Sequence, residues 1–462
     1  MATEGVVKDR STKEKLLAIL FLAIPAMIEN ILQTVVGFVD TLFIAKVGLV
    51  EVTAVGVANA VLAIYLALFM AVGVATSSLI ARSVGAGDME KAKMVAKQSV
   101  VIALVIGGVF GLLTFFFAEF LMGLFGAEAN VIEIGATYLR IVGIPSVFIS
   151  LMLIFGSILR GAGDTKTPMN VAWGINLVHI PLDYVLIFGI GDWAGGGVVG
   201  AAWATVIVRI IGTVALYYYL QKSPVSFSLF TKTDTHSMTS PILSLATPAA
   251  VERLIMRLGQ VLYFGLIVVI GTKTFAAHTI AGTIETFSYM PGYGLAVAAT
   301  TLVGQYLGAG RPQEAYRYGL LTTGVAVVFM SVIGVFLFLF APWLAAWFTN
   351  DPEAIEMVTI ALRIDAFAQP ALAVGLVITG ALQGAGDTKS PLYSTAIGMW
   401  IIRIGGIYLL GIYFELGIAG IWLAIALDIV MRAIFLSWRY RDLFRKLIQE
   451  AQETVATGKL EK

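Results

Sequence analysis

The chain contains no cysteine, which removes several kinds of chemistry. Disulfides, thiolate zinc sites, iron–sulfur clusters and a cysteine nucleophile are excluded among its 462 residues. Histidine is also scarce, because only His179, His236 and His278 occur, at spacings that no common metal motif uses. No glycine-rich nucleotide fingerprint follows a strand pattern, so ATP is not expected to act through this chain. We therefore expect no bound cofactor and no enzymatic activity.

Charged residues are the second scarce class. They make up 13% of the chain, hydrophobic residues make up 59%, and the mean hydropathy is +0.91. This leaves too little polar surface to coat a soluble particle. The formal net charge of +1 gives no indication of nucleic-acid binding. The composition predicts a protein that crosses the lipid bilayer many times.

Apolar stretches long enough to cross a membrane, about 20 residues each, can be drawn about twelve times. They cover about residues 15–46, 53–81, 95–124, 132–158, 169–190 and 198–220, and then 242–271, 276–305, 318–348, 355–381, 392–413 and 418–438. Several are longer than the bilayer requires, so we expect tilts, projection into water or proline kinks. The prolines concerned are Pro25, Pro145, Pro181, Pro248, Pro291 and Pro370.

The two halves of the chain repeat one another. The segment LRGAGDTKTP from Leu159 to Pro168 recurs 223 residues later as LQGAGDTKSP from Leu382 to Pro391. The same shift relates Pro25 to Pro248 and Arg140 to Arg363. This period is too long for a solenoid and is typical of transporters built from two homologous halves. The predicted fold is an all-α integral membrane protein with about twelve transmembrane helices. They form two homologous six-helix lobes related by a pseudo-twofold axis along the membrane normal.

The repeat and the spans divide the chain into five parts. We expect a cytoplasmic N-terminal segment (1–14), an N-lobe (15–221), a cytoplasmic linker (222–240), a C-lobe (241–446) and a cytoplasmic tail (447–462). Lysine and arginine gather in the loops on one side, whereas the opposite loops hold only Lys46 and Lys273. This bias predicts that both termini are cytoplasmic. The first helix is expected to direct insertion, and we expect the plasma membrane of a prokaryote.

The repeated GAGDT loops have two interpretations. Glycine-rich loops that open a helix can bind anions, so a phosphate cradle is one of them. The other is that the glycines form cytoplasmic turns while Asp164 and Asp387 cap the next helices. Pro168 and Pro391 would then lie in or near the first helical turns. We favour the second interpretation.

Ionisable residues inside the membrane are costly and are therefore functional candidates. Asp40 lies near the outer end of the first span, Asp183 lies late on the fifth, and Thr205 lies early on the sixth. The topology brings these three side chains to a similar depth. Two carboxylates in a low dielectric can bind and release a proton near neutral pH. Together with Thr205 they could instead hold Na⁺ as a metal ligand set. The alternative is that either aspartate caps a broken helix or pairs with a buried arginine.

Two neighbouring features extend this site. His179 precedes Asp183 by one helical turn and either relays protons, hydrogen-bonds the carboxylate or is simply packed. On the first span Glu29, Gln33 and Asp40 share one stripe about 16 Å long. Glu29 is either a gate at the inner end or a packing anchor, because Glu252 repeats it.

The C-lobe lacks the carboxylate pair, since Asp40 maps to Tyr263 and Asp183 to Gly406. Ion coupling is therefore expected mainly in the N-lobe. The other ionisable residues of the C-lobe form internal pairs, for example Arg257 with Glu285, or contact substrate. The candidates for the substrate cavity are Gln33, Glu29, Trp173, Met256, Arg257, Glu285, Tyr289 and Arg403. The aromatic and methionine side chains among them could equally be packing or lipid contacts.

The two GAGDT motifs and AATTLVGQYLGAGRPQEA from Ala298 to Ala315 resemble the multidrug and toxic compound extrusion (MATE) transporters. The resemblance covers nearly the whole chain. It implies export of organic, often cationic compounds by a monomer that alternates access in exchange for H⁺ or Na⁺. In the DinF-like branch, acidic residues on the first and fifth helices line the N-lobe cavity, and Asp40 and Asp183 match them. Many relatives have an asparagine at the position of His179, so its replacement favours H⁺ unless Asn176 substitutes.

Two alternatives to a cation-coupled exporter of organic compounds remain open at this point. Relatives in the same superfamily flip lipid-linked saccharides, and a cleft lined by Arg257 and Arg403 could hold a pyrophosphate. A passive channel is disfavoured, because a two-lobe repeat with buried carboxylates suits coupled transport better than conduction. The expected partners are therefore small organic molecules and the lipid bilayer, with no nucleic acid.

Overall fold

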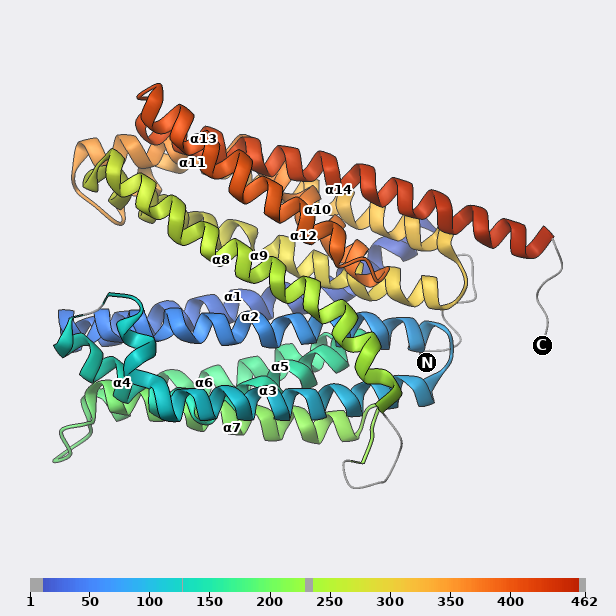
Figure 1. Ribbon diagram of the computed structural model, residues 1–462, viewed down its shortest axis with the longest axis horizontal. Coiled ribbons are helices and arrows are strands. Elements are labelled where there is room, and N and C mark those ends of the chain that lie inside the picture. The colour runs from blue at the N-terminus through green and yellow to red at the C-terminus, as the bar shows by residue number, and fades with distance from the viewer. Residues whose placement is uncertain (1–10, 127, 229–235, 457–462) are drawn as a thin grey trace. The chain divides into compact units, whose positions relative to one another are not determined.

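The computed structural model describes residues 11–126, 128–228 and 236–456. These residues form long helices (Figure 1), and within them the only β-type pairing is an isolated bridge between Ile190 and Trp193. The predicted all-α class is confirmed. Residues 1–10 of the expected N-terminal segment, 229–235 of the linker and 457–462 of the tail lie outside the described residues.

The helices follow the predicted spans closely. In the first half they are α1 (Thr12–Val47), α2 (Leu49–Gly85), α3 (Met89–Gly123), α4 (Ala129–Gly143), α5 (Ser146–Gly161), α6 (Lys166–Phe188) and α7 (Gly197–Gln221). In the second half they are η1 (His236–Met238), α8 (Thr239–Ile270), α9 (Thr272–Gly308), α10 (Pro312–Ala346), α11 (Pro352–Gly384), α12 (Lys389–Ile397), η2 (Gly398–Arg403), α13 (Ile404–Gly406), η3 (Ile407–Tyr413) and α14 (Gly417–Ala456).

Membrane-crossing length and apolar composition are met by ten helical segments within the described residues. The bent pair α4 and α5 makes an eleventh. The one predicted span that remains, 276–305, falls on α9. This helix has 37 residues but is less apolar, because it carries His278, Glu285 and several threonines. The chain is a multi-pass membrane protein.

Some of the predicted spans depart from a regular straight helix. The predicted span 132–158 is broken at Pro145, where α4 and α5 meet at 50°, because proline lacks the N–H that would continue the helix. The other five prolines lie inside continuous helices. In the span 392–413 the stretches η2 and η3 are wound as π-helix, which the sequence pattern did not predict.

The repeated GAGDT loops cap helices in both halves. Asp164 accepts hydrogen bonds from the Thr167 backbone N–H at 2.9 Å and from its hydroxyl at 2.6 Å. Asp387 accepts the same two bonds from Ser390 at 2.9 and 2.5 Å. Gly163, at φ +94°, adopts a left-handed conformation that favours glycine. The capping interpretation is confirmed, since each carboxylate occupies the place that an anion would take at a helix N-terminus.

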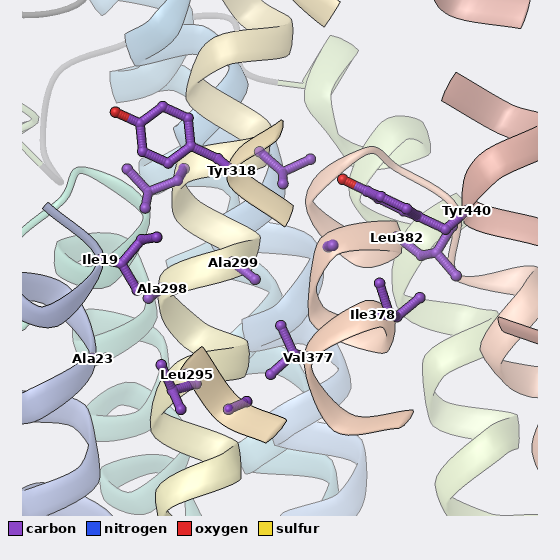
Figure 2. Packing of buried hydrophobic residues seen from close by; sticks show 14 of the residues in the cluster. Ile19, Ala23, Leu295, Ala298, Ala299, Tyr318, Val377, Ile378, Leu382 and Tyr440 are labelled. Carbon is purple, nitrogen blue, oxygen red and sulfur yellow. The ribbon is translucent and has the colours of Figure 1, made fainter. Parts of the chain in front are cut away.

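The chain forms two compact units. The N-unit comprises Ile28–Ile80 and Asp88–Ala250, and the C-unit comprises Val251–Lys462 with Met1–Met27 and Ala81–Gly87. The N-unit core contains Phe69, Met122 and Leu139. In the C-unit one core surrounds Trp422. Another joins α1 to α9, α10, α11 and α14, and Figure 2 shows part of it, with Ile19, Ala23, Leu295, Tyr318, Val377 and Tyr440 among the labelled side chains.

Repeat-equivalent glycines bring the backbones of α2 and α9 into contact inside the C-unit. A Cβ atom on Gly308 would overlap the Arg82 carbonyl oxygen, and one on Gly85 would overlap that of Gln305. We expect Gly308→Ala to destabilise the protein by about 1–3 kcal/mol, because the helices must separate. The control is Gly282→Ala on the same helix, where a Cβ atom meets nothing within 4 Å. Thermal unfolding in detergent tests this, and equal midpoints for the two variants would contradict it.

Candidate functional site

Asp40 on α1 and Asp183 on α6 meet inside the N-unit. Their carboxyl groups are close enough to share a hydrogen bond. Asp183 is 1% exposed, whereas the side chain of Asp40 is 32% exposed. One carboxyl group is therefore enclosed, and its neighbour is partly exposed. The structure brings together the two aspartates that the sequence singled out.

His179 and Asn176 lie on α6, one and two turns before Asp183. The His179 ring is buried, and its Nε2 atom lies 4.0 Å from Asp40 Oδ2. That distance is too long for a direct hydrogen bond. His179 therefore faces the carboxylate of the neighbouring helix α1, in addition to preceding Asp183 on its own helix.

Unpaired polar atoms gather at this point. Within the described part of the chain, Asp40 Oδ1, Asp183 Oδ2, His179 Nε2 and Asn176 Nδ2 are buried without a hydrogen-bond partner. Leaving one such group unpaired costs about 1–3 kcal/mol. Four such atoms in one place are expected where a site is built for binding rather than for stability.

Two further side chains complete the site, and the sequence analysis missed both. Tyr138 on α4 is buried and lies within hydrogen-bonding reach of Thr205 on α7. The Thr205 hydroxyl donates to the Ala201 carbonyl at 3.0 Å. Arg209, one turn after Thr205, donates to the Val142 carbonyl at 3.5 Å, and its charge acts on Tyr138 and His179. Arg209 is an ionisable residue in a predicted span, so the rule that identified Asp40 would also have found it. Tyr138 carried no such signal.

The geometry disfavours the structural interpretations of the two aspartates. Asp40 lies inside α1, which continues to Val47, so it does not cap that helix. In the described ranges neither aspartate forms an ion pair with Arg209, whose guanidinium instead reaches a backbone carbonyl. Nor do the described residues contain three or more His, Asp or Glu side chains arranged to hold a metal ion. The site is a carboxyl pair with hydroxyl and imidazole neighbours.

The rest of the α1 stripe has a different environment. Glu29 pairs with Arg160 of α5 at 3.0 Å, and both side chains are largely buried. Its repeat-equivalent Glu252 accepts a hydrogen bond from Thr395 of α12 at 3.0 Å. In each half the glutamate thus ties the first helix to the region of the GAGDT motif, which supports the packing interpretation. Gln33, one turn after Glu29, is exposed.

The ionisable residues of the C-unit pair mainly with one another. Asp428 is fully buried and bonds to Arg403 at 2.8 Å and to Arg432 at 2.6 Å. The predicted pair of Arg257 with Glu285 is wrong. Arg257 lies on an exposed face of α8 and donates a hydrogen bond to Gln260 at 3.2 Å. Glu285 instead interacts electrostatically with Arg403.

Asp365 is another buried acid of the C-unit. It is 1% exposed and accepts a hydrogen bond from Gln369 at 2.7 Å, and Gln369 also contacts Ser288 at 3.0 Å. Its charge also interacts with that of Glu285 on α9, whose side chain is neither fully buried nor fully exposed. The C-unit therefore also contains two neighbouring carboxyl groups, and coupling mainly in the N-lobe stays a prediction.

The predicted substrate contacts are scattered over the two units. Trp173 in the N-unit is 46% exposed, and Met256 in the C-unit is 38% exposed. Tyr289 is half-buried, and its ring lies edge-on to that of Tyr293 with the centroids 5.6 Å apart. Exposure alone does not distinguish a cavity wall from a lipid-facing surface, so their role stays a prediction.

Comparison with known proteins gives one consistent result. The family model MatE matches residues 25–185 and again 248–409, which follows the repeat read from the sequence. The chain is 33% identical to the probable multidrug resistance protein NorM of Thermotoga maritima over 89% of each chain. It is 25% identical to the multidrug resistance protein PmpM of Pseudomonas aeruginosa, over 95% of this chain and 94% of that protein. A solved outward-facing structure of a multidrug resistance MATE family transporter superposes with a TM-score of 0.88 at 26% identity, covering 96% of this chain and all of that one.

Proposed function

We propose that this chain, which belongs to the multidrug and toxic compound extrusion (MATE) family of membrane transporters, exports organic, often cationic compounds in exchange for an inward-moving cation. It is a transporter and not an enzyme. The multidrug names of NorM and PmpM support this substrate class. We further propose that the chain works as a monomer in a prokaryotic plasma membrane with both termini cytoplasmic, which the lysine and arginine bias supports.

The observation that carries the coupling proposal is the Asp40 and Asp183 pair with its buried unpaired atoms. Two carboxyl groups that share a hydrogen bond hold one proton between them. We therefore favour H⁺ over Na⁺. Na⁺ would need several more oxygen ligands than the two carboxyl groups and the Thr205 hydroxyl supply.

Protonation would act through helix α1. Its residues up to Met27 belong to the C-unit and those from Ile28 to the N-unit, so one helix is part of both. Proton uptake at Asp40 and Asp183 removes negative charge beside Arg209 and Tyr138, and this changes the packing of α1, α6 and α7. Alternating access would follow if the two protonation states favour different conformations.

The lipid-linked saccharide flippase is less well supported. Its pyrophosphate was expected to contact Arg257 and Arg403, but Arg403 is already paired with Asp428. A fixed anion beside the guanidinium weakens its attraction for a second one.

Vesicles containing the purified protein test the proposed function. A fluorescent organic cation is loaded, and a proton gradient or a sodium gradient is imposed separately. We expect the proton gradient alone to drive export. Export driven by the sodium gradient alone would overturn the choice of ion but would still support an antiporter. The absence of flux with any cation under either gradient would overturn the export proposal.

A further inference from the structure

A long apolar groove runs along α10 in the C-unit, outside the site described above. It has a volume of about 990 Å³ and lies between the first turn of α1 and one face of α10. Leu320, Gly324, Val328 and Val332 form its length, spaced four residues apart on one helix face. From Leu320 to Val332 this is about 18 Å at 1.5 Å per residue. That length exceeds half of a hydrocarbon core of about 30 Å, so the groove can hold an acyl chain of one leaflet.

The floor of the groove is packed against the protein core. Leu321 and Val325 line it and pack against the buried core shown in part in Figure 2, which includes Tyr318 and Ile19. The outer side chains Val328 and Val332 are 67% and 66% exposed. Gly324 deepens the middle, since a Cβ atom there would meet nothing within 4 Å. The shape is therefore set by a packed core and a missing side chain.

One end of the groove is cationic. Lys15 of α1 and Arg317 of α10 share the single carboxylate of Glu314, at 2.5 and 2.9 Å. Lys15 is mostly buried, whereas the side chain of Arg317 is 67% exposed. The adjacent Glu14 accepts a hydrogen bond from the Ser11 backbone at 2.7 Å, and Lys13 beside it is exposed. Three cations and two carboxylates leave a net positive charge where the apolar groove begins.

We propose that this groove binds an anionic phospholipid, with one acyl chain along α10 and the phosphate on Arg317. A guanidinium has five donors in a fork that matches phosphate, and Glu314 occupies only part of it. The predicted orientation places this end of α10 at the cytoplasmic surface, where anionic lipids are drawn to clustered basic residues. The lipid would lie against both α1 and α10 and so stabilise their junction, which Lys15 and Glu314 already hold.

The test uses full-length protein in detergent with dioleoylphosphatidylglycerol or dioleoylphosphatidylcholine added, and counts bound lipid by native mass spectrometry. We expect the wild type to prefer phosphatidylglycerol. Arg317→Gln should lose about tenfold or more of that affinity, as for one charge-assisted hydrogen bond, and bind the two lipids alike. Gly324→Leu should bind neither, because its side chain fills the groove.

The matched control is Gly108→Leu on α3, which also places a side chain in open space and should bind lipid as the wild type does. Each variant is first checked for an unchanged unfolding midpoint without lipid. Equal binding of both lipids by the wild type, or wild-type binding by Gly324→Leu, would overturn the proposal. Because no transport is measured, the result is independent of the export function.

Discussion

Replacing Asp183 with asparagine is expected to abolish gradient-driven export. Asparagine is close in size to a protonated aspartic acid, but it cannot release a proton, so the enclosed member of the pair would stay neutral and only Asp40 could still titrate. A carrier whose cycle depends on proton uptake and release by the enclosed carboxyl group cannot complete the exchange when that group stays neutral. We expect the rate of proton-driven efflux of an organic cation to fall at least about a hundredfold, which corresponds to about 2.7 kcal/mol.

The same variant should remain folded. Asp183 is 1% exposed and leaves Oδ2 unpaired, so a neutral side chain of the same shape should not lower the unfolding midpoint. The control is Asp192→Asn in the exposed loop between α6 and α7, which should transport normally. Export by Asp183→Asn at the wild-type rate would remove this pair from the mechanism. A lowered midpoint would instead indicate a structural role.

The fold could be predicted because its signals are strong. Apolar runs of membrane-spanning length predicted the helices, and the repeat of 223 residues predicted their division into two homologous halves. Neither prediction needed side-chain detail. Asp40 and Asp183 were found by a rule of the same kind, since a charge within an apolar run stands out. The spacing of the helices then explains why the two meet, because both lie at the outer ends of their predicted spans.

The sequence indicated much less clearly which face of each helix contacts its neighbours. A helix in a membrane is apolar on all sides, so its sequence does not show which face meets a neighbour. Tyr138 reaches Thr205 from α4 and could not be placed without the helix rotation. The same ambiguity explains the mistaken pairing of Arg257 with Glu285, because Arg257 lies on the exposed face of α8. The π-helical winding of η2 and η3 also changes the direction in which successive side chains point. Predictions from residue spacing assume a regular α-helix and therefore fail along these stretches.

Replacing Asp428 with alanine is expected to cause the largest loss of stability in the C-unit. Asp428 is 0% exposed and is the carboxylate shared by Arg403 and Arg432. Removing it leaves two largely buried guanidinium groups without their counter-ion. Breaking a buried ion pair in this way costs about 3–5 kcal/mol. The unfolding midpoint in detergent should therefore fall sharply, and much of the protein should aggregate when it is purified.

A matched control lies on the same helix. Asp442 of α14 also contacts two cations, Lys446 at 2.9 Å and Arg439 at 3.4 Å, but its side chain is 28% exposed. Asp442→Ala should lower the unfolding midpoint far less than Asp428→Ala does, because water screens these pairs. Adding Arg403→Met to Asp428→Ala should recover part of the lost stability, since the cost comes mainly from a charge left buried and unpaired. If the two single aspartate variants unfold at the same temperature, desolvation of the arginines is not what makes Asp428 important.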